Sequence, residues 1–151
     1  MIRRGTTEDV DAIAELYDRS FRTLTFLPVL HTVDDHRSWF GRQFAQHEPW
    51  VWDDGDVRGF LVLTDDEVMY LYLDPSFTGR GIGSELLAHA KERRPNGFTL
   101  WTFQQNEGAR RFYERHGLHA ILFTDGEGNE EKVPDVKYEW RPADRSEPSE
   151  R

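Results

Sequence analysis

Apolar residues at helical spacing predict four helices along the chain. The first follows the polar start Thr6-Thr7-Glu8-Asp9, after which apolar side chains recur at Val10, Ile13, Ala14, Leu16 and Tyr17. A hydroxyl cap, two carboxylates and this spacing predict a helix over residues 7–20. The same reasoning predicts further helices over residues 33–48, 81–93 and 106–116.

Between the second and third helices the period changes from helical to alternating, which is typical of strands. Residues 50–52 and 57–64 flank the turn Asp53-Asp54-Gly55-Asp56, where Asp-Gly supplies the positive φ of a tight hairpin. Further strands are predicted over residues 68–73, 98–103, 118–124 and 136–140. The order ααβββαβαββ predicts an α/β (α+β) fold with a mixed, mostly antiparallel central sheet flanked by helices.

Length and charge limit the classes of function. The chain has 151 residues and a net charge of -9, which fits one domain over residues 1–141. Residues 142–151 hold Pro, Ser and charge without periodicity and are expected to form a disordered tail. The negative charge repels phosphate backbones and acidic membrane surfaces, so neither nucleic acid nor membrane is expected as a partner.

Other absences in the composition narrow the chemistry. There is no cysteine, which excludes disulfides, thiolate metal sites and a cysteine nucleophile. The six histidines show no paired ligand spacing with carboxylates, so no metal is expected. No apolar run approaches the roughly 18 residues that span a bilayer, and a cytoplasmic protein is expected.

A glycine-rich segment joins the third strand to the third helix. It reads Asp74-Pro75-Ser76-Phe77-Thr78-Gly79-Arg80-Gly81-Ile82-Gly83-Ser84. Glycines here allow close approach of the backbone, and the exposed amides at the start of a helix suit a pyrophosphate, with Arg80 as an added cation. Taken alone, the pattern fits a structural turn equally well.

A second motif changes this balance. It runs from Asn106 to Leu118 as Asn-Glu-Gly-Ala-Arg-Arg-Phe-Tyr-Glu-Arg-His-Gly-Leu. Asn106 is expected to cap a helix and Gly117 to end it. Together with residues 78–83, this segment resembles the two cofactor-binding motifs of the GNAT superfamily of acetyl-CoA-dependent N-acetyltransferases. Thr78 departs from the Gln or Arg usual in the family, and Leu118 replaces a more usual Phe.

The resemblance, which covers about residues 1–140, implies a set of cofactor-binding residues for acetyl-CoA. The backbone of Leu71, Tyr72 and Leu73 would bind the pantetheine arm as an added strand. The pyrophosphate would lie on the loop, and Asn106 would contact the cofactor from the next helix. The implied loop residues are Thr78, Gly79, Arg80, Gly81, Ile82, Gly83 and Ser84.

The resemblance also assigns the chemistry. Tyr113 falls on the family's general acid, which protonates the departing thiolate. An attacking amine must be neutral, so a base is needed. Glu67 is the first candidate, because residues 67, 69, 71 and 73 share a face of an extended strand unless a bulge intervenes. A solvated residue of an acidic turn is the alternative reading of Glu67. His31, in the loop between the first two helices, is a candidate for the acceptor pocket or for the base.

The resemblance implies direct transfer from acetyl-CoA to a primary amine of a small molecule or peptide within a ternary complex. The absence of cysteine favours direct attack. The acidic composition favours a cationic acceptor. A non-catalytic acyl-CoA-binding sensor or partner module is the alternative, and a homodimer is left open.

Overall fold

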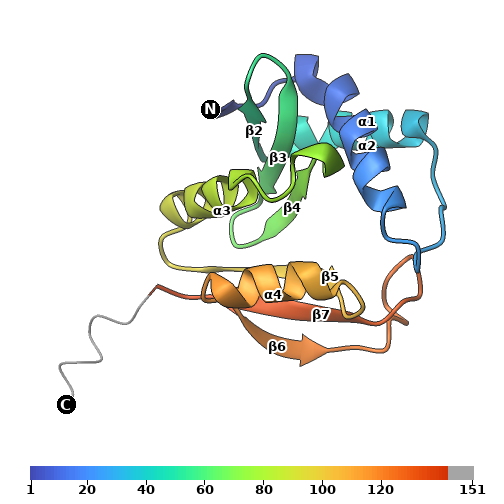
Figure 1. The fold of residues 1–151 in the computed structure, drawn as a ribbon, viewed down its shortest axis with the longest axis vertical. Coiled ribbons are helices and arrows are strands. Elements are labelled where there is room, and N and C mark those ends of the chain that lie inside the picture. Colours follow the sequence, from blue (N-terminus) through green and yellow to red (C-terminus); the bar gives the residue numbers. More distant parts are fainter. Residues whose placement is uncertain (143–151) are drawn as a thin grey trace.

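The computed structural model describes residues 1–142 and confirms every predicted helix and strand (Figure 1). The helices are α1 (Val10–Arg22), α2 (Val33–Gln46), α3 (Ile82–Arg93) and α4 (Glu107–Arg115). The strands are β1 (Ile2–Arg4), β2 (Glu48–Asp53), β3 (Val57–Leu63), β4 (Val68–Leu73), β5 (Phe98–Phe103), β6 (His119–Phe123) and β7 (Asp135–Trp140). The tail expected over residues 142–151 lies, apart from Pro142, outside the described residues.

The strands form two antiparallel sheets, of order β1-β2-β3-β4 and β5-β7-β6. Within residues 1–142, one isolated parallel bridge between Glu67 and Thr99 lies where β4 and β5 begin. Beyond this bridge the two sheets splay apart (Figure 1). The predicted fold class is confirmed, and the expected central sheet is resolved into two halves that meet at one parallel contact.

Strand β1 is absent from the predicted order. Its three residues, Ile2–Arg4, include two arginines and show no alternation, so only their pairing with β2 identifies them as a strand. Arg3 also binds Asp9 through two hydrogen bonds of 2.8 and 3.0 Å, which tie the strand to the turn before α1. The strand therefore depends on contacts that are distant in sequence and carry no local signal.

A bulge in β4 changes which side chains share a face. Val62 pairs with Tyr70 whereas Leu63 pairs with Val68, so Met69 is the extra residue. Val68 consequently lies on the same face as Leu71, and Glu67 falls on the opposite one. The expectation that residues 67, 69, 71 and 73 share one face is therefore wrong, because the bulge shifts the alternation by one residue.

Alternation along β3 divides the core between the two faces of the first sheet. Phe60 and Val62 pack with α1 and α2, whereas Leu61 and Leu63 pack with α3. The second group continues into the face of the second sheet that α4 covers, through Tyr113. Burying each large apolar side chain stabilises the fold by about 1.5–3 kcal/mol. Side chains of β4 pack in both clusters and those of β5 in the second, so the core positions the two strands on either side of the space between them.

Within residues 1–142, no helix is both long and apolar enough to cross a bilayer. The longest helix, α2, has 14 residues and carries several charges.

Candidate active site

The cleft between β4 and β5 forms a cavity. Strand β4 pairs with β3 along one edge, and β5 pairs with β7 along its far edge. Within residues 1–142, the facing edges of β4 and β5 meet only at the Glu67 bridge. A cavity of about 660 Å³ lies here, which we call the cofactor cavity. A strand edge without a partner can hydrogen-bond an extended, amide-containing ligand.

The glycine-rich turn lines one end of this cavity. Gly79 and Gly81 have φ values of 79° and 85°, which residues with a Cβ rarely adopt. Gly81 is the N-cap of α3, and no side chain caps the helix there. The first amides of α3 are therefore available to a ligand, and the helix dipole makes this position suitable for an anion.

Gly83 has a different role in the same turn. A Cβ at this position would lie 3.3 Å from the Cζ atom of Phe112. That distance is tight, so Gly83 permits the close packing of α3 against α4. The sequence pattern of three glycines thus combines a binding requirement at two positions with a packing requirement at the third.

Most of the residues predicted to bind the cofactor line this cavity. They are Leu71, Tyr72, Leu73, Thr78, Gly79, Gly81, Gly83, Ser84 and Asn106. Arg80 and Ile82 are not among the lining residues. The guanidinium of Arg80 lies 4.5 Å from the centre of the Phe77 ring, and the side chain of Ile82 is buried in the core.

Asn106 and Tyr113 enter the cavity from α4. The side-chain oxygen of Asn106 accepts a hydrogen bond of 3.2 Å from the Ala109 amide, which confirms the predicted cap. Tyr113 is 8% exposed and lines the cavity. Burial raises the pKa of its hydroxyl above the ordinary value, so the phenol is a neutral donor at pH 7. Among the described residues no hydrogen bond to this hydroxyl is found.

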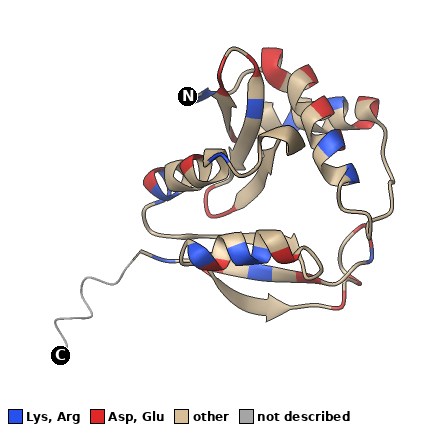
Figure 2. Cartoon of the chain, in the orientation of Figure 1, with Lys and Arg blue, Asp and Glu red and all other residues tan. Residues whose placement is uncertain are grey.

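The charges around the cofactor cavity are few and positive. Arg115 of α4 is the one charged side chain among the described residues that line it. Figure 2 shows further basic residues along α4, together with acidic ones. A polyanionic ligand therefore meets backbone amides and nearby cations here, in spite of the net charge of -9.

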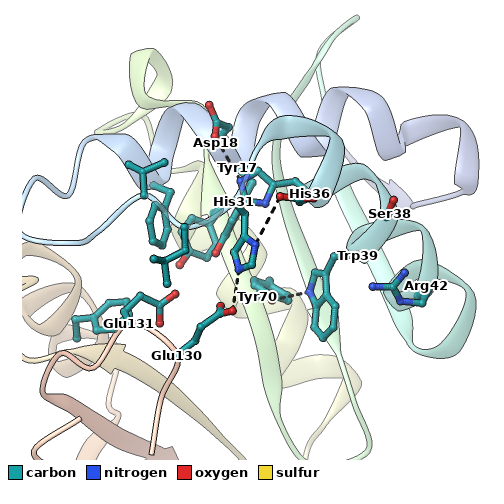
Figure 3. A pocket seen from close by; sticks show the side chains of 16 residues that line it. Tyr17, Asp18, His31, His36, Ser38, Trp39, Arg42, Tyr70, Glu130 and Glu131 are labelled. Atoms are coloured by element: carbon teal, nitrogen blue, oxygen red, sulfur yellow. Dashed lines mark hydrogen bonds and ion pairs between the residues drawn. The ribbon is translucent and has the colours of Figure 1, made fainter. Parts of the chain in front are cut away.

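A second cavity of about 630 Å³ adjoins the first, and we call it the acceptor cavity (Figure 3). Its walls come from α1, the loop before α2, α2, β4, the end of β5 and residues 130–131. Tyr70, Tyr72 and Phe103 line both cavities. Two ligands bound separately would therefore meet at these three aromatic residues.

His31, the predicted substrate-binding residue, lines the acceptor cavity. Its Nε2 atom is 2.9 Å from a carboxylate oxygen of Glu130 (Figure 3). This hydrogen bond raises the pKa of His31, which favours the protonated imidazole. The ring is therefore better suited to a binding role in the pocket than to accepting a proton as a base.

Glu67 lies outside the residues that line either cavity in the described chain. It stands at the bridge between the two sheets, where burial, followed by the nearby Asp66, raises the pKa of its carboxyl, while Lys137 opposes the shift. The raised pKa makes Glu67 a stronger base than an ordinary glutamate. A proton from the acceptor cavity would need water to reach it.

Several acceptor-cavity residues had no signal in the sequence. His36 is buried, with Nε2 3.4 Å from Asp18, and burial lowers its pKa. The indole nitrogen of Trp39 donates a hydrogen bond of 2.8 Å to the Tyr70 hydroxyl. Glu131 lines the same cavity from the segment between β6 and β7. The one sequence feature that could have indicated these residues is the pair of adjacent carboxylates at residues 130–131.

Among the described residues, no group of three or more His, Asp or Glu side chains is placed to hold a metal ion.

Two bacterial proteins named as peptidyl-lysine N-acetyltransferases are similar to part of this chain. YiaC of Escherichia coli (strain K12) is 30% identical over 79 residues, which cover 51% of this chain and 53% of YiaC. YjaB of Salmonella typhimurium (strain LT2) is 37% identical over 68 residues, which cover 45% of this chain and 46% of YjaB. The chain thus spans about half the length of these curated relatives.

A solved structure has the same fold over nearly its whole length. The structure of yncA from Salmonella typhimurium with its cofactor acetyl-CoA has a TM-score of 0.73 and 18% sequence identity. The similarity covers 96% of this chain and 95% of yncA.

A match to a family extends across both predicted motifs. Residues 10–118, from the first residue of α1 to the residue before β6, match the acetyltransferase (GNAT) family. The match includes the glycine-rich turn and α4, which together line the cofactor cavity. With this match over most of its length and the same fold, the chain belongs to the acetyltransferase (GNAT) family.

Proposed function

We propose that this chain transfers an acetyl group from acetyl-CoA to a primary amine by direct attack in a ternary complex. The observation that carries the proposal is the meeting of the cofactor and acceptor cavities at Tyr70, Tyr72 and Phe103. Two substrates held on either side of these residues can react without a covalent enzyme intermediate. Proximity of this kind supplies much of the rate enhancement in bimolecular reactions.

The residues of the cofactor cavity fit acetyl-CoA. A Cβ added at Gly79 or Gly81 would meet nothing within 4 Å, so the glycines leave an open cradle beside the first amides of α3. This cradle would hold the pyrophosphate, and Arg115 would add a positive charge. The open edge of β4 at residues 71–73 would bind the pantetheine amides, with Asn106 opposite. Acetyl-CoA would supply the activated thioester.

Tyr113 is the proposed general acid. Its neutral hydroxyl would donate a proton to the departing thiolate as the amine forms its bond to the acetyl carbon. Burial keeps the phenol protonated at pH 7. Glu67 stays our candidate base, acting through water, and His31 our candidate acceptor-binding residue.

The acceptor is proposed to be cationic before it loses its proton. Four carboxylates and one guanidinium line the acceptor cavity in the described chain, so its charge attracts amines. The names of YiaC and YjaB support a peptide lysine as one acceptor class. A homodimer and a cytoplasmic location stay predictions.

Two measurements test the proposal. Calorimetric titration should show saturable binding of acetyl-CoA and none of ATP, and thiol release should then follow addition of an Ala-Lys-Ala peptide with blocked termini. Failure to bind acetyl-CoA would contradict the proposal outright. Binding without transfer to any amine would favour the alternative, a non-catalytic acyl-CoA sensor.

A further inference from the structure

The four carboxylates of the acceptor cavity differ in whether they have a hydrogen-bond or ion-pair partner. Three of its four carboxylates already bind neighbouring groups. The contacts are Arg22 to Asp18 at 2.8 Å, His31 to Glu130 at 2.9 Å and the Thr32 amide to Asp35 at 2.9 Å. Glu131 lines the same cavity, and within residues 1–142 it has no hydrogen-bond or ion-pair partner. Its charge is therefore available to a ligand.

Glu131 lies close to the place where the two cavities meet. Burial is the main reason why the pKa values of Tyr17, Tyr70 and Tyr72 are raised, and neighbouring tyrosines add to the shift at Tyr17 and Tyr72. The negative charge of Glu131 contributes further at all three. Tyr70 and Tyr72 line both cavities. Figure 3 shows Glu130 and Glu131 on the side of the cavity opposite α1 and α2. A group bound to Glu131 would thus share the cavity with the reacting amine.

The walls between these charges are apolar and aromatic. Val29 and Leu30 are 52% and 48% exposed, yet both line the cavity, together with the rings of Tyr17 and Trp39. Such a surface suits a methylene chain, and aromatic faces also attract cations. The basic side chains of the lining are two histidines and one arginine. His31 contacts Glu130, His36 contacts Asp18, and Arg42 lies over the Trp39 ring at 5.6 Å. Each of these groups has its own partner, so none occupies Glu131.

The amine that attacks must be uncharged, because only the neutral nitrogen has a free lone pair. An unpaired carboxylate favours the charged form of any amine beside it, which opposes attack. Glu131 is therefore poorly suited to bind the nitrogen that attacks. It is well suited to bind a second ammonium group that does not react.

We propose that the acceptor is a small aliphatic diamine, and that Glu131 binds the ammonium group that is not acetylated. This inference rests on the proposed acetyltransferase function and narrows its acceptor. The methylene chain would lie along Val29, Leu30 and the aromatic rings, and the other nitrogen would reach Tyr70 and Tyr72.

The test compares cadaverine with pentylamine, which has the same carbon chain and lacks the second amine. Thiol release should give the wild-type chain a kcat/KM for cadaverine at least about tenfold above that for pentylamine, the scale of one charged contact. Glu131→Gln should reduce this ratio to about two, because the value for cadaverine falls more than the value for pentylamine. Glu127→Gln removes the same charge from the same segment outside the cavity, and it should keep the wild-type ratio.

Acetyl-CoA binding by calorimetry, measured on each variant, shows whether the fold and the cofactor cavity are intact. Equal kcat/KM values for the two amines in the wild type would overturn the inference, as would an unchanged ratio in a folded Glu131→Gln variant. If the blocked lysine peptide is acetylated while the diamine preference is missing, the inference fails and the proposed function stands. If no amine is acetylated, both fail.

Discussion

The two cavities have nearly equal volumes, about 660 and 630 Å³, but they are built from different parts of the chain. The cofactor cavity presents main chain, namely the open edges of β4 and β5 and the amides at the start of α3. The acceptor cavity presents side chains from segments as distant as Tyr17 and Glu131. Main-chain binding needs a local conformation that a short motif encodes, whereas the acceptor cavity needs tertiary contacts. The first can be recognised from the sequence, and the second cannot.

Replacing Tyr113 should separate binding from chemistry within the cofactor cavity. Tyr113→Phe removes the proton donor and keeps the ring, so kcat should fall about 100-fold. The affinity for acetyl-CoA should stay unchanged, because the phenol is buried and the cradle lies elsewhere. Thiol-release kinetics and calorimetry on the same preparation check both statements. An unchanged kcat would remove Tyr113 from the mechanism.

A change outside both cavities should weaken the fold and leave the binding of both substrates unchanged. Glu48 accepts hydrogen bonds of 2.6 Å from Arg93, 2.8 Å from Trp50 and 3.0 Å from Arg94. Burial by itself raises the pKa of Glu48, but these hydrogen bonds outweigh it and lower the pKa to about 2. Glu48→Gln should reduce the free energy of unfolding by about 2 kcal/mol at pH 7.

The pH dependence of this effect has a definite sign. The folded-state pKa lies below the ordinary value of 4.5, so the stabilisation is complete above that pH and is lost as the pH falls toward 2. Urea unfolding at pH 7 and pH 3 should show the wild type and Glu48→Gln converging at the lower pH. A constant difference would mean that the carboxylate charge is not the source of the stability. The KM values for both substrates should be those of the wild type.

Gly81→Ala should act on the cofactor side alone. The φ of 85° costs a residue with a Cβ about 1–2 kcal/mol, so the turn should shift and misalign the first amides of α3. We expect acetyl-CoA affinity to fall about tenfold with the acceptor KM unchanged. The control is Gly41→Ala in α2, where φ is not positive and a Cβ meets nothing within 4 Å. Equal effects of the two variants would show that the left-handed turn is not needed.

Trp39→Phe should give the smallest effect, and on the acceptor side alone. It removes the hydrogen bond from the indole nitrogen to Tyr70 and keeps an aromatic wall. A net loss of about 0.7 kcal/mol corresponds to a roughly threefold higher acceptor KM. The KM for acetyl-CoA should not change. A comparable rise in both constants would show that the two cavities are coupled through Tyr70 and are not independent.

The parts of the fold that were predicted are those with a strong local signal. Strands β4 and β5 have the bounds predicted from alternation, and the cap at Asn106 is confirmed by its hydrogen bond. Strand β1 was missed, because three residues without alternation become a strand only through pairing.

The candidate site shows the same division. The glycine-rich turn and Tyr113 follow from motifs, and both line the cofactor cavity. The face assigned to Glu67 was wrong because one extra residue, Met69, reverses the alternation, and its position depends on how β3 pairs. Glu131 and His36 come together with Tyr70 only in the folded chain, so no spacing could have predicted their cavity.

The unpaired edge of β4 has a consequence for how this chain can change over generations. A ligand held by main-chain hydrogen bonds is insensitive to which side chains the strand carries, provided that the strand keeps its conformation. Binding of the donor at residues 71–73 therefore requires only side chains that keep the strand packed, as Leu71 and Leu73 do against the core. The acceptor cavity has no such protection, since each contact belongs to an individual side chain. Under the proposed function, divergence at a few positions there would change which amine is accepted while the acetyl donor stays the same.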